Sequence, residues 1–321
     1  MKKFAVFLCL CFVNAAGAQT LVLERTIPLT GVTGKLDHSS VDQAGGRLFA
    51  SAWFMNCVKV IDLKAGKVVR SIENLPNPQG VLYVPELQRF YAATEGDGSL
   101  HVIDGRDYSA VAVIPLGEDA DNIRYDAKSN RLYVGYEDGA LGIVDATTNT
   151  LVKKVALKGH PEAFALSTTT PRVYLNTPHS HNLTVYDRAL DQVVAEWPMG
   201  EIGENFTVTL DEASNRAFVG SRKPPFFLVY DLTTGKEVAR IPVHGNTDDF
   251  HYDAKRKRIY ASCGEGFIDV YTQIDPDHYA LKESVKTAPL GRTCSFDGDR
   301  IYLSVQDSKD QPAEIRVYKV Q

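Results

Sequence analysis

Short runs in which apolar and polar residues alternate recur at a regular interval along most of the chain. Each run contains an arginine, an apolar residue, an aromatic residue and then a small or aliphatic residue. The seven copies are Arg47-Leu48-Phe49-Ala50, Arg89-Phe90-Tyr91-Ala92, Arg131-Leu132-Tyr133-Val134, Arg172-Val173-Tyr174-Leu175, Arg216-Ala217-Phe218-Val219, Arg258-Ile259-Tyr260-Ala261 and Arg300-Ile301-Tyr302-Leu303. Successive arginines lie 42, 42, 41, 44, 42 and 42 residues apart. A period this regular indicates a repeat protein.

A second pattern has the same period. Residues 58–62 read Val-Lys-Val-Ile-Asp, and equivalents end at Asp104, Asp145, Asp187 and Asp231, whereas the last two repeats keep only the alternating apolar residues. Alternation with a period of two in β-branched and aromatic runs predicts β-strands. In the fifth repeat it predicts four strands, at 206–210, 217–220, 227–230 and 237–242.

Four strands in a repeat of about 42 residues are typical of a β-propeller blade, so the chain is predicted to be an all-β, seven-bladed β-propeller with four-stranded blades. The seventh repeat lacks an outer strand before the sequence ends at Gln321. Residues 21–29 are similar to the outer strands that end at Ile114-Pro115-Leu116. We therefore expect this N-terminal strand to complete the last blade and remove an open sheet edge.

The first 18 residues have the pattern of a secretory signal peptide. Lys2 and Lys3 precede the apolar run 4–13, which is too short to span a bilayer, and Ala16-Gly17-Ala18 offers a cleavage site. We expect cleavage after Ala18, a single propeller domain over 19–321, and a periplasmic or secreted location.

Composition narrows the range of partners. The 321 residues are 44% hydrophobic and 23% charged, as in a folded globular protein. Without Lys2 and Lys3 the chain carries 33 basic and 40 acidic side chains, a net charge of −7. Because nucleic acids and anionic membranes attract clustered Lys and Arg, we expect neither as a partner. We expect a monomer that binds a small molecule or a protein.

Several phrases resemble the YVTN-repeat, YncE-like family of secreted seven-bladed propellers. They include Arg131-Leu132-Tyr133-Val134, Val102-Ile103-Asp104 and Ile114-Pro115-Leu116-Gly117. The stretches 247–260 and 263–267 look like one bacterial branch of that family. The resemblance covers essentially all of 19–321 and implies the architecture strongly and an activity weakly, because one propeller fold serves many functions.

Polar residues precede each predicted inner strand, about nine residues before each repeat arginine, and should converge at one mouth of the central channel. The candidate ligand-binding residues are Asp37, His38, Gln79, Asn122, Glu162, Asn205, Asp249 and Arg292. Carboxylate and amide oxygens suit Ca²⁺ or another hard cation, so Glu162, Asp249, Asn122 and Asn205 are also candidate metal ligands. This set is similar to the Glu, Asn and Asp ring of six-bladed calcium-dependent lactonases, although the blade number differs.

Three interpretations of this mouth stay open: a solvated structural ring, a ligand or partner site, and a metal-dependent catalytic site. Because no haem-attachment motif, phosphate-binding loop or nucleophile elbow is present, we favour a binding module that requires no cofactor, with a divalent cation as a possible ligand. The alternative is a metal-dependent lactonase, lyase or hydrolase in which His38 or His251 moves the proton. The loops at 53–55 and 223–226 are candidate partner contacts.

Other conspicuous side chains have structural interpretations. His179 and His181 are expected on a surface loop. The repeat arginines are expected to form ion pairs across a hairpin with the aspartates five residues earlier, namely Asp42, Asp126, Asp211 and Asp253. The repeat aromatics are expected to pack between blades.

Three cysteines lie beyond residue 18. A disulfide between Cys263 and Cys294, which would leave Cys57 unpaired, and three buried thiols are the two alternatives.

Overall fold

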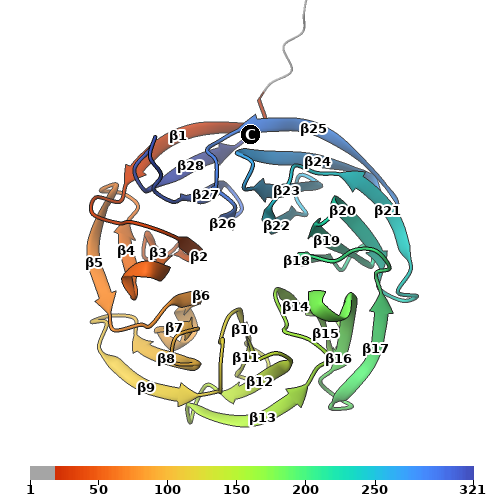
Figure 1. Ribbon diagram of the computed structural model, residues 1–321, viewed down its shortest axis with the longest axis horizontal. Helices are drawn as coiled ribbons and strands as arrows, with labels where there is room; N and C mark the ends of the chain where they lie inside the picture. Colours follow the sequence, from red (N-terminus) through yellow and green to blue (C-terminus); the bar gives the residue numbers. More distant parts are fainter. Residues whose placement is uncertain (1–18) are drawn as a thin grey trace, which may run out of the picture.

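A computed structural model describes residues 19–321, and these residues form a ring of seven antiparallel sheets around a central channel (Figure 1). The chain is an all-β, seven-bladed β-propeller with four strands in every blade, as predicted. The predicted signal peptide, 1–18, lies outside the described residues.

In each blade the strands follow one another from the channel to the perimeter. Blades one to three consist of β2 (Leu36–Asp42), β3 (Arg47–Ala52), β4 (Cys57–Asp62) and β5 (Lys67–Glu73); β6 (Pro78–Val84), β7 (Arg89–Thr94), β8 (Ser99–Asp104) and β9 (Ala110–Pro115); and β10 (Ile123–Asp126), β11 (Arg131–Tyr136), β12 (Ala140–Asp145) and β13 (Thr150–Ala156). Blades four and five consist of β14 (Phe164–Leu166), β15 (Arg172–Thr177), β16 (Asn182–Asp187) and β17 (Gln192–Pro198); and β18 (Asn205–Asp211), β19 (Arg216–Arg222), β20 (Pro225–Asp231) and β21 (Glu237–Pro242).

Blade six consists of β22 (Thr247–Asp253), β23 (Arg258–Cys263), β24 (Phe267–Asp275) and β25 (His278–Lys286). Blade seven is built from β26 (Thr293–Phe296), β27 (Arg300–Val305), β28 (Glu314–Val320) and, outermost, β1 (Leu21–Pro28). Three short 3₁₀ helices, η1 (Trp53–Met55), η2 (Pro85–Leu87) and η3 (Pro178–Ser180), lie in loops. Within 19–321 no helix is both long and apolar enough to cross a membrane.

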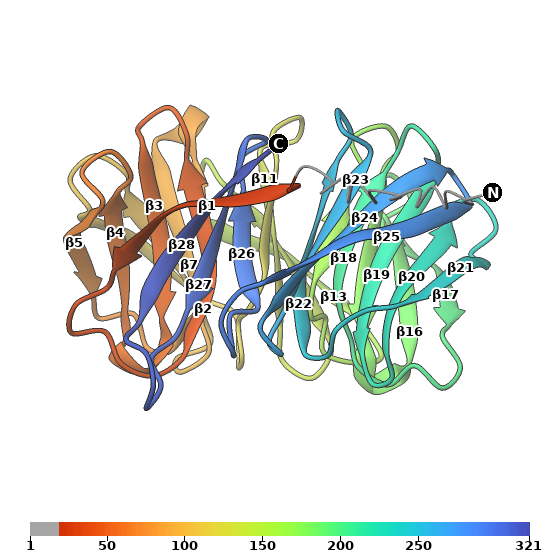
Figure 2. The ribbon, with the colours of Figure 1, turned by 90° about the horizontal axis from the view of Figure 1, so that it is seen from above.

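The two ends of the described chain close the ring, as the sequence predicted. Strand β1 pairs antiparallel with β28, with Leu21 opposite Val320 and Ile27 opposite Ile315. The backbone N–H of Gln321 donates to the carbonyl of Thr20 at 3.0 Å. Figure 2 shows β1 lying across the outside of β28. The last blade therefore has no unpaired outer edge at β28.

Turn chemistry explains why the third strand of a repeat ends at an aspartate. In the fifth blade the carboxylate of Asp231 accepts hydrogen bonds from the backbone N–H groups of Thr233 and Thr234, at 3.0 and 2.8 Å. Gly235 has a φ of +69°, a conformation that glycine adopts without strain. The same aspartate-centred turn follows Asp62 and Asp145.

The core consists of seven apolar clusters, each between neighbouring blades of the described ring. One repeat aromatic belongs to each cluster, and the seven are Phe49, Tyr91, Tyr133, Tyr174, Phe218, Tyr260 and Tyr302. Between blades one and two, for example, the ring centroids of Phe49 and Phe90 lie 4.6 Å apart. The prediction that the repeat aromatics pack between blades is therefore confirmed.

The predicted partners of the repeat arginines are wrong in three of the four cases. Arg47 pairs with Asp42 at 2.6 Å, as predicted, whereas Arg131 pairs with Asp145 and Arg216 with Asp231. In both blades the strand register places the arginine opposite the earlier aspartate and also opposite the aspartate that ends the third strand, and the guanidinium pairs with the latter.

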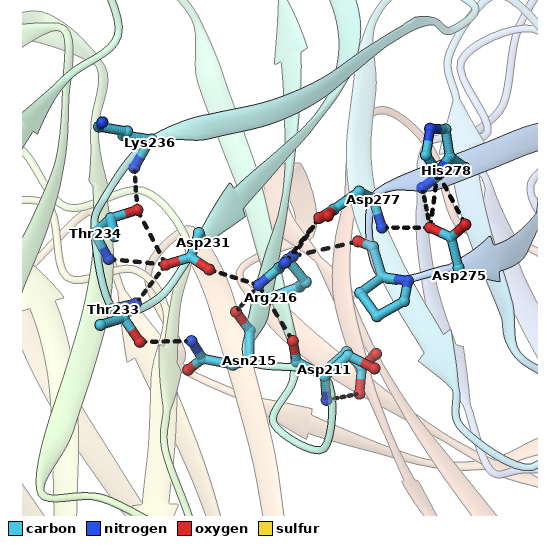
Figure 3. A network of polar contacts seen from close by, with 12 residues as sticks. Asp211, Asn215, Arg216, Asp231, Thr233, Thr234, Lys236, Asp275, Asp277 and His278 are labelled. Carbon is cyan, nitrogen blue, oxygen red and sulfur yellow. Dashed lines mark hydrogen bonds and ion pairs between the residues drawn. The ribbon is translucent and has the colours of Figure 1, made fainter.

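The other three aspartates, which lie in the first hairpin of their blades, contact different partners. Figure 3 shows Arg216 between Asp231 and Asp277, with Asp211 turned toward its own hairpin. Asp126 pairs with Arg188 at 2.7 Å, and Asp253 pairs with Arg256 at 2.8 Å rather than with Arg258. The arginines remain structural, as expected, through different contacts.

Candidate functional site: the central channel

The central channel contains a cavity of about 820 Å³ lined by the inner strands. It extends from His38, Asn122 and Asp249, near the start of those strands, to Lys128 and Glu212 beyond their far ends. This volume falls within the roughly 300–1,000 Å³ of small-molecule pockets. Three of the predicted ligand-binding residues, His38, Asn122 and Asp249, line the cavity.

An ion pair between blades one and six lies at the end of the cavity where the inner strands begin, which we call the inner end. Nδ1 of His38 is 3.5 Å from Oδ2 of Asp249, and the same oxygen accepts the backbone N–H of Cys294 at 2.8 Å. Burial by itself would lower the pKa of His38, but Asp249, with Asp37 and Asp121 farther away, outweighs burial and raises that pKa to about 10. Burial opposes ionisation of Asp249, yet His38 keeps the pKa of this carboxyl below its ordinary value. His38 is therefore a cation at neutral pH.

The second histidine of the cavity, His251, has a lowered pKa. Nε2 of His251 donates to the carbonyl of Cys294 at 3.1 Å. Burial lowers the pKa of His251, and the nearby charges of Arg124 and His38 act in the same direction, although Asp249 opposes them. His251 is therefore neutral above pH 7.

Arg124 brings a further positive charge into the cavity. Its guanidinium donates to the carbonyl of Ile123 at 2.8 Å and to Oδ1 of Asn122 at 3.3 Å, and it lies 5.4 Å from the centroid of Phe164. Within residues 19–321, no carboxylate oxygen lies within 4.0 Å of its nitrogens. Burial lowers the pKa of Arg124, while Asp249 and Asp121 partly oppose that effect. An arginine nevertheless stays protonated in proteins, so this charge lacks a direct counter-ion.

At the channel mouth, charged side chains form ion pairs with one another. Lys35 pairs with Asp37 at 2.6 Å, and Asp248 pairs with both Arg222 and Arg292, at 2.6 and 2.9 Å. Asp37 and Arg292, which were predicted to bind a ligand, are therefore each engaged with an opposite charge. Gln79 at the same mouth donates to Asp119 at 2.8 Å.

A separate group of ionisable side chains lies where blades three and four meet. Asp121, His160 and Glu162 each present an atom suited to a metal, and these three atoms lie within 4.8 Å of one another. Burial, followed by the charge of Asp121, raises the pKa of Glu162. Burial alone would lower the pKa of His160, but Asp121 and the carbonyl of Glu137 raise it to about 9.

The four predicted metal ligands do not form one set. Glu162 belongs to the group with Asp121 and His160, whereas Asp249 belongs to a second group with His251 and Cys294. Asn205 is fully buried, and its amide nitrogen donates to Asn176 and to the carbonyl of Asn182, at 2.9 and 3.0 Å. Its contacts tie neighbouring strands together, which is a structural role.

Sequence reasoning missed Arg124 and the meeting of Asp121 with His160. Arg124 lies two residues after Asn122 at the start of β10, and the alternation of side chains in a strand places both on the channel side. That signal was available in the sequence. The approach of His160 to Asp121 depends on the path of the loop between β13 and β14, which no local pattern specifies.

Of the two alternatives for the cysteines, the structure shows the second, in which Cys57, Cys263 and Cys294 are buried free thiols. Cys263 packs between blades five and six, whereas Cys294 packs between blades six and seven. Sγ of Cys294 instead lies 3.5 Å from Oγ of Ser262. Neighbouring residues of a strand point to opposite faces, so the side chain of Cys263 faces away from Cys294.

Two surface predictions can be compared with the structure. His179 lies in η3, and His181 caps that helix and contacts the carbonyl of Ile202 through Nδ1 at 2.9 Å. In the loop at 53–55, Phe54 is 63% exposed, while the indole N–H of Trp53 donates to Glu95 at 2.8 Å. Only Phe54 of this loop offers a large free apolar surface.

Solved structures similar to this chain share its fold and little of its sequence. A chain of hydrazine synthase from Kuenenia stuttgartiensis aligns with a TM-score of 0.75 at 17% identity, over 89% of this chain and 97% of its own length. A chain from the crystal structure of the mitotic checkpoint complex aligns with a TM-score of 0.80 at 11% identity, over 100% of this chain and 98% of its own. No family model and no curated protein sequence matches. These similarities support the seven-bladed propeller, a fold consistent with a binding module, and no particular activity.

Proposed function

We propose that this protein is a secreted, YncE-like propeller that binds a small organic anion, such as a carboxylate, in its central channel. The observation that carries the proposal is Arg124, a cation that faces the cavity without a carboxylate within 4.0 Å in the described chain. The repeat phrases support the family assignment, and residues 2–18 support export to the periplasm or beyond.

Charge at the inner end of the cavity favours an anion. Of the residues that line this end of the cavity, protonated His38 and Arg124 supply two positive charges and Asp249 one negative charge, while Asp37 and Asp121 lie beyond the lining. A carboxylate beside Arg124 would accept two parallel N–H bonds, the geometry in which a guanidinium binds most selectively. The nearby Phe164, Phe250 and Phe296 give the same cavity apolar walls for the rest of a ligand. In this proposal the protein is a monomer, and it binds its ligand without requiring a cofactor.

Calorimetric titration of the protein with acetate, succinate and citrate, and with succinamide as the uncharged match, tests the proposal. Arg124→Met should weaken carboxylate binding by about 10- to 150-fold, since a hydrogen bond to a charged group contributes about 1.5–3 kcal/mol. Arg188→Met is the matched control, because Arg188 lines the far end of the same cavity and already pairs with Asp126 at 2.7 Å. Equal binding of succinate and succinamide, or an equal loss in both variants, would refute an anion site at Arg124.

A further inference from the structure

The group formed by Asp121, His160 and Glu162 lies outside the cavity and has no role in the proposed anion site. Asp121 precedes β10 of blade three, while His160 and Glu162 lie in the loop that enters β14 of blade four. Asp121 and His160 are each only 6% exposed. Two carboxylates and an imidazole are thus gathered at one buried place from two blades.

His160 is oriented as a metal-binding histidine would be. Its Nδ1 donates to the carbonyl of Glu137 at 2.6 Å and lies 3.7 Å from Oδ2 of Asp119, which leaves Nε2 as the nitrogen that faces Asp121. Among residues 19–321, Nε2 has no hydrogen-bond partner, and the nearest carboxylate oxygen, Oδ2 of Asp121, is 3.9 Å away. Histidines that bind a metal commonly donate their other ring N–H to a backbone carbonyl, as His160 does.

The carboxylates are also available. Within the described chain, the side chain of Glu162 makes no hydrogen bond and no ion pair, although it is partly buried. The carboxylate of Asp121 accepts one long hydrogen bond, from the amide of Asn122 at 3.3 Å. Two acidic groups so close together repel each other when both are ionised, and a bound cation removes that repulsion as protonation does.

We propose that Asp121, His160 and Glu162 bind one divalent transition-metal ion, with Zn²⁺ as the best match, at the mouth of the channel. An imidazole nitrogen with two carboxylate oxygens suits Zn²⁺, whereas Ca²⁺ takes six to eight oxygen ligands. Ligand atoms about 2.0–2.2 Å from a tetrahedral ion lie about 3.3–3.6 Å from one another. The donor atoms, now within 4.8 Å, need to close by roughly 1 Å, which side-chain rotation supplies.

The other group of potential ligands is already engaged. Asp249 is bound to His38 and to the backbone of Cys294, and His251 donates to the Cys294 carbonyl. Burial also raises the pKa of the Cys294 thiol well above its ordinary value, so the thiolate that a metal requires is disfavoured. Of the two groups, the one around His160 is therefore better suited to bind a metal ion.

The test is calorimetric titration of the chelator-treated full protein with ZnCl₂, and separately with CaCl₂. One Zn²⁺ should bind per chain, and Glu162→Gln, which keeps the side-chain size, should weaken binding by roughly 100-fold or more, beyond the 10- to 100-fold of outer-shell changes. His160→Ala should do the same. His181→Ala is the matched control, because His181 also contacts a backbone carbonyl through Nδ1 but is not part of a carboxylate group.

Circular dichroism spectra of each variant establish that the propeller is intact before binding is compared. Absence of Zn²⁺ binding by the unsubstituted protein, or binding unchanged in folded Glu162→Gln, would overturn the proposal. Binding lost instead in Cys294→Ser would place the ion in the second group and also overturn it. Arg124→Met should leave Zn²⁺ binding unchanged, so failure of this site and failure of the anion site are separate results.

Discussion

The two histidines of the cavity should differ sharply in how they couple stability to pH. The change is His38→Gln, with His251→Gln as its control, since both residues line the same cavity and both substitutions keep a polar side chain. The pKa of His38 is raised from 6.5 to about 10 in the folded protein, whereas burial lowers the pKa of His251. Of these two histidines, only His38 therefore holds a proton in the folded protein above pH 7.

The direction and size follow from proton binding. Between pH 6.5 and 10 the folded chain holds a proton on His38 that the unfolded chain has lost, so folding takes up that proton. The stabilisation that the His38 proton gives the folded protein is complete below pH 6.5, and it is lost as the pH rises through the folded-state pKa of about 10. One proton corresponds to about 1.4 kcal/mol per pH unit, or about 2 kcal/mol between pH 7.5 and 9.

Urea unfolding at pH 7.5, 8.0, 8.5 and 9.0 measures this difference. The free energy of unfolding of the unsubstituted protein should fall with pH more steeply than that of His38→Gln, by about 2 kcal/mol over the range. His251→Gln should retain the full slope. A slope unchanged in His38→Gln, or lost equally in both variants, would refute the assignment of a protonated His38 paired with Asp249.

Two further predictions concern the ring and its thiols. Ile27→Ala should lower the free energy of unfolding by about 2–5 kcal/mol, because Ile27 in β1 is fully buried. Leu23 is 49% exposed in the same strand, so Leu23→Ala should change the free energy of unfolding by less than about 0.5 kcal/mol. Equal urea midpoints for the two variants would contradict ring closure by β1. In protein that lacks residues 1–18, Ellman's reagent without reductant should label Cys57, Cys263 and Cys294 only after unfolding, whereas one labelled thiol would reveal a disulfide.

The architecture was predictable because it depends on local and repeated signals. The arginine and aspartate that recur every 42 residues or so mark strand ends, and the buried aromatic at the second position after each arginine marks the blade interface. The strand 21–28 was recognisable as an outer strand because it ends in the same apolar-proline pattern as β9. Each of these inferences needs only the sequence of one repeat compared with another.

The site was predictable only in part, because it depends on contacts between repeats. His38 and Asp249 were both placed at the channel, but their pairing joins blades one and six. Asn205 was chosen by position alone, and its amide nitrogen is buried against Asn176 in the neighbouring blade. The orientation of His160 comes from the carbonyl of Glu137 in another blade, and a backbone atom carries no sequence signal.

The pairing of β1 with β28 also has a consequence for the order in which the molecule is made. Leu21 lies opposite Val320, so the first strand of the propeller to be synthesised pairs with the last strand of the propeller. Closing a loop of about 300 residues costs about 3 kcal/mol more in chain entropy than closing a hairpin of about ten. Blades one to six can form from local hairpins as the chain grows, while the buried face of β1 waits without a partner. The first strand of the propeller to emerge is thus the last to pair.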